Sequence, residues 1–176
     1  ILLVSGSNKK KNFEVLDVLR DFNNEKNLNI DIGTAYNPYL KNHYNICGER
    51  ERIKKKFSCR LTKSIWLQFG TDIKLLEKEI NFLNDSVLNN TSHSKDKNVK
   101  IFGSLLIPSK EFISRFKFRP WKGVFISEKY LNSLDDFYAF TKDLIEIYLD
   151  NNICPIIETE CSSIKKLQDI HSLMKK

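Results

Sequence analysis

The densest group of side chains able to bind a phosphorylated ligand lies in the run Glu49-Arg50-Glu51-Arg52-Ile53-Lys54-Lys55-Lys56. On a helix, Glu49, Arg52 and Lys56 are spaced three and four residues apart and therefore share one face. A carboxylate beside two cations can hold a ribose hydroxyl and a diphosphate together. A charged helix face that merely contacts water has the same pattern, and both interpretations stay open.

A single amide, Gln68, ends the apolar run Ile65-Trp66-Leu67. A buried amide needs hydrogen-bond partners. It can satisfy the backbone of a neighbouring loop, or it can bind a heterocycle that offers paired donor and acceptor atoms. Gln68 is therefore a candidate substrate-binding residue, provided that its strand ends at a ligand site.

The stretch from Arg115 to Lys122 interleaves cations with aromatic rings. Stretches of this kind bind single-stranded nucleic acid. A helix end that packs its rings beneath the next loop and leaves its cations in water has the same composition. Because no RNA-binding motif accompanies the stretch, we expect the packing role and no nucleic-acid partner.

Six short apolar runs alternate with amphipathic runs and predict six strands, each followed by a helix. The predicted strands are Ile1–Val4, Asn29–Ala35, Ser64–Phe69, Val99–Ile107, Gly123–Ser127 and Ile153–Glu158. Helices are predicted near Ile46–Cys59 and Pro108–Lys117, and after caps at Asn12, at Thr71 or Asp72, at Ser133 with Asp136, and at Ser162 or Ser163. The polar tract 84–97 between them is expected to be a mobile loop.

Near-continuous apolar strands between helices indicate an α/β fold with a parallel sheet. Units of roughly 30 residues are typical of a (β/α)8 TIM barrel, of which this chain would hold about six units in one domain, residues 1–176. An open doubly wound sheet is the competing fold, but no Gly-rich dinucleotide fingerprint follows a predicted strand. In a barrel of this type, ligands bind at the carboxyl ends of the strands.

The formal net charge of +7 and the isoelectric point near 9.2 suit an anionic partner such as a phosphorylated cofactor. The four cysteines form no CxxC pair and lie far from the three histidines in sequence, so we expect no metal and reduced, cytoplasmic thiols. No apolar run reaches the ~20 residues that a membrane span requires. The chain opens directly on an apolar run without Met, which we interpret as a truncation.

The order of these motifs resembles that of the methylenetetrahydrofolate reductase family, from its third strand to its end. The resemblance rests on the turn Leu2–Ser7, the strand Ile30–Ala35 leading into Asn37-Pro38-Tyr39, the helix Glu49–Lys56, the strand ending in Gln68, and the run Val99–Pro108. It implies a divergent member whose TIM barrel lacks its first two β–α units here. The family binds FAD at the strand ends. Its enzymes pass a hydride from NAD(P)H through FAD to 5,10-methylenetetrahydrofolate, giving 5-methyltetrahydrofolate.

By this resemblance, Gln68 would hold the folate pterin. FAD would contact Ser5, Gly6, Ser7, Asn37, Tyr39, Glu49, Arg52, Lys55 and Lys56. Where this chain has Ser5 and Ser7, the family has an arginine and an aspartate, a departure that would change the redox potential of the flavin or abolish its binding. The family's catalytic glutamate lies on its first strand, so this chain alone would be inactive. A flavin-free folate-binding barrel serving one-carbon transfer is therefore the alternative, and a homo-oligomer is compatible with both.

Overall fold

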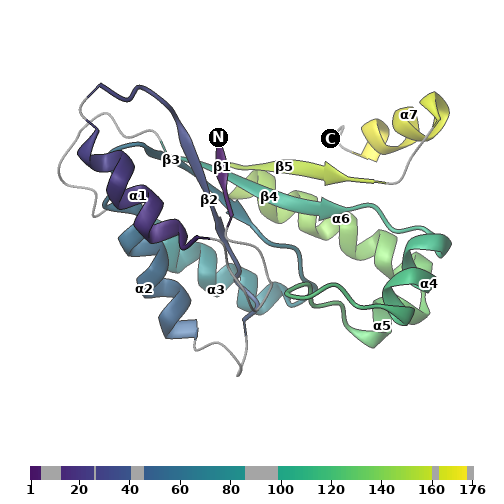
Figure 1. Cartoon of the computed structure of the whole chain (residues 1–176). Coiled ribbons are helices and arrows are strands. Elements are labelled where there is room, and N and C mark those ends of the chain that lie inside the picture. Colours follow the sequence, from purple (N-terminus) through teal and green to yellow (C-terminus); the bar gives the residue numbers. More distant parts are fainter. Residues whose placement is uncertain (5–12, 26, 41–45, 86–98, 160–162, 174–176) are drawn as a thin grey trace.

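A computed structural model describes residues 1–4, 13–25, 27–40, 46–85, 99–159 and 163–173 (Figure 1). Its strands are β1 (Leu2–Leu3), β2 (Ile32–Tyr36), β3 (Thr62–Leu67), β4 (Lys100–Leu106) and β5 (Ile153–Glu158). Its helices are α1 (Val15–Asn24), α2 (Ile46–Phe57), α3 (Ile73–Leu83), α4 (Lys110–Phe118), α5 (Glu128–Asn132), α6 (Leu134–Asp150) and α7 (Ile164–Leu173). Residues 86–97 of the predicted mobile loop and the cap at Asn12 lie outside the described residues, whereas Asn84 caps the end of α3.

The five strands form one parallel sheet in the order β1-β2-β3-β4-β5, and helices follow the strands along the chain. This arrangement confirms the predicted α/β class with a parallel sheet. Strands that are consecutive in the sequence are adjacent in the sheet. Each connection therefore leads from one strand to the strand beside it, as in successive β–α units.

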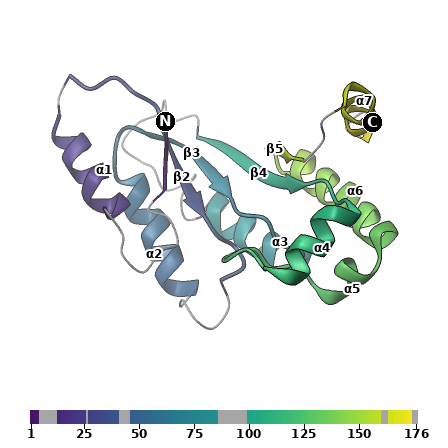
Figure 2. The same ribbon diagram turned by 45° about the vertical axis from the view of Figure 1, so that its right-hand side comes forward.

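Four helices pack on the same face of the sheet. The side chains of Ile32 and Tyr36 point to this face, since Ile32 packs with Leu19 of α1 and the Tyr36 hydroxyl contacts Glu79 of α3. The ring of Tyr148 in α6 lies against Gly103 of β4, which is level with Tyr36 in the sheet. Two views of the ribbon show α1, α2, α3 and α6 on this side, with α7 apart from them beyond the end of β5 (Figures 1 and 2).

The prediction of a strand at Gly123–Ser127, the fifth of the six predicted along the chain, is wrong. Phe125 makes only an isolated parallel bridge to Gly70, and the residues on either side of it belong to no strand. The partner edge that such a strand would need is already taken, because β4 pairs directly with β5 over six positions. The short helix α5, which the sequence did not predict, follows this segment.

Polar caps fix where three of the helices begin. Asp72 accepts a hydrogen bond from the backbone N–H of Leu75 at 3.0 Å and starts α3, as one of the two predicted caps. The Ser133 hydroxyl accepts from the backbone N–H of Asp136 at 3.1 Å and starts α6. The Ser109 hydroxyl accepts from the backbone N–H of Phe112 and starts α4. Each such cap typically contributes about 1 kcal/mol to helix stability.

Candidate functional site

The residues that follow the strands all lie at one edge of the sheet, because the strands are parallel. Asn37 follows β2, Gln68 follows β3, and Glu158 is the last residue of β5. The turn Ser5-Gly6-Ser7, which follows β1, lies outside the described residues. The candidate site is therefore built from the ends of β2 to β5 and from the start of α2.

Asn37 links three segments at the end of β2. Its side-chain oxygen accepts a hydrogen bond from the backbone N–H of Tyr39 at 3.0 Å, forming a tight Asx turn. Its side-chain nitrogen donates to the carbonyl of Gly123 at 2.8 Å, and its backbone N–H donates to Glu49 at 3.4 Å. Asn37 thus joins the loop before α5 and the first turn of α2 to the sheet.

Arg52 lies between two carboxylates at this corner. Its guanidinium donates to Glu14 at 2.5 Å and lies 3.8 Å from Glu49, which is one turn earlier on α2. The Arg52 side chain keeps 34% of its surface exposed. The predicted acid and cation therefore do share a face, and the guanidinium already has carboxylate partners on it.

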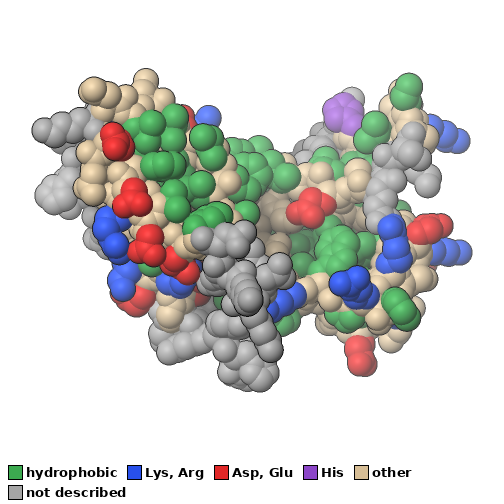
Figure 3. Space-filling view, viewed as in Figure 1, with side chains coloured by type: hydrophobic (Ala, Val, Ile, Leu, Met, Phe, Trp, Pro, Cys, Tyr) green, Lys and Arg blue, Asp and Glu red, His purple; other side chains and the backbone are tan. Residues whose placement is uncertain are grey.

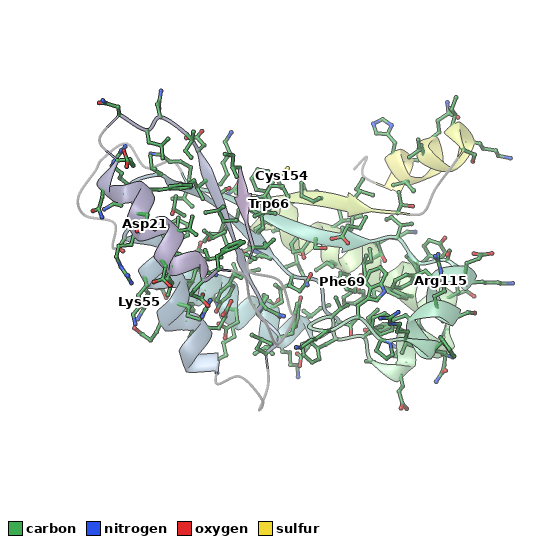
Figure 4. All side chains as sticks on the ribbon, in the orientation of Figure 1. Asp21, Lys55, Trp66, Phe69, Arg115 and Cys154 are labelled. Carbon is green, nitrogen blue, oxygen red and sulfur yellow. The ribbon has the colours of Figure 1, made fainter. Side chains whose placement is uncertain are left out.

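The two lysines of the predicted phosphate surface diverge. Lys56 is 5% exposed, and its ammonium donates to the carbonyl of Ala35 in β2 at 2.6 Å. Lys55 is exposed and lies on the outer side of α2, away from the sheet (Figure 4). Lys56 therefore approaches the strand ends from within the core, whereas Lys55 contacts solvent.

Gln68 has one side-chain hydrogen bond among the described residues. Its oxygen accepts from the backbone N–H of Phe69 at 3.0 Å, while its own backbone N–H donates to Tyr36 in the sheet. The side chain is half-buried. The bond to Phe69 is the loop interaction that the sequence analysis set against ligand binding, and it leaves the amide nitrogen as a donor.

Tyr39 is buried rather than open to a ligand. Its side chain is 2% exposed, and its ring covers Gly70, where a Cβ atom would lie 2.5 Å from the ring. Burial raises the pKa of Tyr39 well above its ordinary value. The tight contact explains the glycine at position 70: any side chain there would displace the ring that packs the end of β3.

A buried ionic network lies beneath this corner. The carboxylate of Glu79 is 1% exposed and accepts two hydrogen bonds from Arg50, at 2.7 and 3.0 Å, and one from the Tyr36 hydroxyl at 2.5 Å. Burial first, and then the bond to Glu79, raises the pKa of Tyr36, and the same carboxylate raises that of Arg50. The sequence analysis missed this network. The sequence feature that could have indicated the network is the acidic residue Glu79, which lies within the apolar stripe of α3 between Leu76 and Leu83.

Glu158 forms a pair with Ser104 at the ends of β5 and β4. The Ser104 hydroxyl donates to one oxygen of the Glu158 carboxylate. The backbone carbonyl of Ser104 accepts from the Tyr148 hydroxyl at 3.0 Å. The sequence analysis predicted only that ligands bind at the strand ends, and the pairing of these two side chains came from the fold.

The basic and aromatic stretch has the packing role that we expected. Trp121 contacts the rings of Phe112 and Phe116 edge-on, with centroids 5.4 and 6.2 Å away. Phe118 is 91% exposed, and Trp121 is 44% exposed. Lys and Arg side chains lie around α4 on the face shown in Figure 3. The Trp121 ring thus packs against α4 with part of its surface open to solvent.

Other classes of site receive no support from the described part of the chain. Within it, no group of three His, Cys, Asp or Glu side chains could hold a metal ion. No helix there has the length and apolar character needed to cross a bilayer. No protein-family model matches this chain, and no curated protein matches it in sequence.

Proposed function

We propose that this chain is part of a (β/α)8 barrel related to the methylenetetrahydrofolate reductases, which reduce a folate at the strand ends with FAD and NAD(P)H. The observation that carries the proposal is that four of the residues chosen from sequence for FAD and folate lie at one edge of a parallel sheet. Asn37, Glu49 and Arg52 are joined there by direct contacts, and Gln68 follows the next strand. Sequential strand order with helices on one face supports the barrel.

The residues at this corner fit a dinucleotide in position and donor type. Glu49 offers a carboxylate for a ribose hydroxyl, and Arg52 offers a planar guanidinium for a diphosphate. Because Arg52 is one-third exposed, a phosphate can replace Glu14 as its partner without opening the core. Bound FAD would supply the hydride relay between NAD(P)H and the folate, while Gln68 would orient the heterocycle through its amide N–H.

The carboxylate partners of Arg52 favour one alternative. A guanidinium that already contacts Glu14 and lies near Glu49 gains less free energy from binding a diphosphate, because it would have to give up a carboxylate partner. A folate-binding protein without flavin, serving a one-carbon transfer partner, would use Gln68 and the strand ends but leave this corner closed.

Reconstitution separates the two functions. The chain is incubated with FAD, passed through a desalting column and examined for flavin absorbance, and tetrahydrofolate binding is measured by calorimetry. We expect retained flavin, and an affinity for FAD that falls about 10- to 100-fold in Arg52→Ala, the equivalent of about 1.5–3 kcal/mol for a charge-assisted hydrogen bond. Lys54→Ala, on the same helix but paired with Glu51, is the matched control and should keep the affinity.

A colourless protein that retains no FAD but binds tetrahydrofolate would replace the reductase with the flavin-free function. A protein that binds neither ligand would exclude both.

A further inference from the structure

The outer side of α4 ends in an aromatic ring that the protein leaves uncovered. The helix buries Phe112, Ile113 and Phe116 against the core. Because successive residues are turned by about 100° around a helix, Phe118 points to the opposite side. Phe118 is 91% exposed. A ring in this position adds nothing to the core, so it is available to a partner outside the chain.

A turn after α4 holds a second ring close to the first in the chain. Pro120 ends the helix, because the residue before a proline avoids helical backbone, and Arg119 has left the helical region with φ −140° and ψ 85°. The carbonyl of Trp121 accepts from the backbone N–H of Val124 at 3.2 Å, and Gly123 supplies the positive φ of 85° in this turn. Trp121 thus packs on α4 and still keeps 44% of its surface exposed.

Cations accompany the two rings in the sequence. Residues 115–122 contain four cations and no carboxylate, a net charge of +4 against +7 for the whole chain. The Lys117 ammonium donates to the side-chain oxygen of Asn132 at 2.8 Å, a neutral partner that does not cancel its charge. We use the name basic-aromatic tip for the six exposed side chains Arg115, Lys117, Phe118, Arg119, Trp121 and Lys122.

The basic-aromatic tip is fixed to the sheet and lies at one end of the molecule. Just beyond it in the chain, the carbonyl of Gly123 accepts from Asn37 at 2.8 Å, and that of Phe125 accepts from the backbone N–H of Thr71 at 2.9 Å. Figures 1 and 4 show α4, on which Arg115 is labelled, at the end of the molecule opposite to α1 and α2. A surface that is fixed in advance loses little conformational freedom on binding.

We propose that the basic-aromatic tip docks on the surface of an anionic phospholipid bilayer. Phe118 would enter the acyl region, Trp121 would lie at the headgroup level, and the four cations would contact lipid phosphates. Tryptophan favours the headgroup level because its ring is apolar and its N–H is polar. Each Lys or Arg near an anionic surface strengthens binding about 5-fold, and one buried ring adds roughly 10-fold or more.

The exposure of Phe118 favours a membrane over single-stranded nucleic acid. Bases stack on rings that line a groove along the strand. A ring that is 91% exposed on the outer side of a helix is not part of a groove wall. A bilayer, with negative headgroups above an apolar interior, accepts both the projecting ring and the cations beside it. This docking surface lies on α4 and the turn after it, and it needs neither a flavin nor a folate.

Vesicle binding tests the docking surface in the 176-residue chain. The protein is sedimented with vesicles of phosphatidylcholine alone, or of phosphatidylcholine and phosphatidylserine in equal parts, at low and at high salt. We expect binding to the anionic vesicles to be at least about 10-fold tighter than to the neutral ones, and to weaken as salt screens the cations. After Trp66→Phe, Trp121 is the only tryptophan, and its emission should shift to shorter wavelength on anionic vesicles.

A substitution of the projecting ring tests its insertion. Phe118→Ser should weaken binding to the anionic vesicles about 10-fold or more. Phe13→Ser is the matched control, because Phe13 is also an exposed ring, at 43%, but precedes α1 at the other end of the molecule. The control should bind as the parent does. Circular dichroism and thermal unfolding verify that each variant is folded.

A pair of substitutions tests the cations of the tip. Lys117→Gln combined with Arg119→Gln should weaken binding to the anionic vesicles about 10- to 30-fold. Lys74→Gln combined with Lys78→Gln removes the same charge from exposed positions on α3 and should change the binding little. The comparison separates contacts of the tip from the attraction of the net charge.

Membrane docking is refuted if the chain does not bind anionic vesicles, if it binds neutral vesicles equally well, or if Trp121 emission does not shift on binding. It is also refuted if either folded tip variant, Phe118→Ser or Lys117→Gln with Arg119→Gln, binds unchanged. Titration with single-stranded oligouridylate on the same samples identifies the rival partner. A chain that binds the oligonucleotide through Phe118 but binds no vesicle would have a nucleic-acid interface at this tip instead.

Discussion

Among the ion pairs of the described residues, the buried contact between Arg50 and Glu79 should be the most costly to break. Glu79 is 1% exposed and accepts two hydrogen bonds from Arg50, whose guanidinium also lies over the ring of Phe82 at 4.4 Å. Arg50→Met keeps much of the apolar volume but leaves the carboxylate buried, with Tyr36 as its remaining donor. Removing one partner of a buried pair costs about 3–5 kcal/mol, because the other charge stays in the core uncompensated.

For a domain of this size, 1 kcal/mol corresponds to about 2–4 °C in melting temperature, so we expect Arg50→Met to lower it by about 6–20 °C. Arg20→Met is the matched control. It makes the same change in a pair with Asp17 whose two side chains are 71% and 61% exposed, and such pairs contribute about 0–1 kcal/mol.

A double substitution distinguishes the lost pair from lost packing. Arg50→Met with Glu79→Met removes both charges, and it should recover most of the stability that Arg50→Met alone loses. Urea unfolding of the four proteins at neutral pH, followed by circular dichroism, gives the free energies. If Arg50→Met costs no more than Arg20→Met, or if the double variant is as unstable as Arg50→Met, Glu79 is not a buried charge that needs this partner.

Three further expectations follow from the described contacts. Tyr36, Tyr39 and Tyr148 have pKa values raised mainly by burial, so they ionise only on unfolding. Their contribution to stability is complete below pH 10 and is lost above it, at about 1.4 kcal/mol per pH unit for each tyrosine, and a Phe at any one position should reduce that slope in urea unfolding. Asn37→Ala should lower the free energy of unfolding by about 1–3 kcal/mol and speed tryptic cleavage of the loop before α5. Unchanged stability and cleavage would show that the two side-chain hydrogen bonds of Asn37 are dispensable. Gly103→Ala would place a methyl group 2.4 Å from the Tyr148 ring, and unchanged thermal stability would show that α6 can shift.

Local patterns in the sequence determined most of the elements. Apolar runs between amphipathic runs predicted all five strands, and β5 has the predicted bounds, Ile153–Glu158. The cap at Ser133 was predicted from its spacing to Asp136 and is present. These features depend on residues within one or two turns of each other, so the order of residue types is enough to predict them.

The number of strands was decided by the tertiary structure. The run Val124-Phe125-Ile126 looks like a strand, but β5 occupies the position beside β4 that such a strand would need, and Gly123 turns the backbone with a φ of 85° before it. Competition between segments for one sheet edge is not visible in either segment alone.

Side-chain partners were also decided by the fold. Arg50 and Arg52 stand two residues apart in the same charged run, and the sequence does not indicate which carboxylate each of them meets. Arg50 turns into the core to meet Glu79, 29 residues away, while Arg52 meets Glu14 across 38 residues. Which face of a helix is buried, and which distant carboxylate arrives there, depends on how β–α units pack together. The sequence therefore determined which groups could bind or react, and the packing of distant segments decided which of them meet.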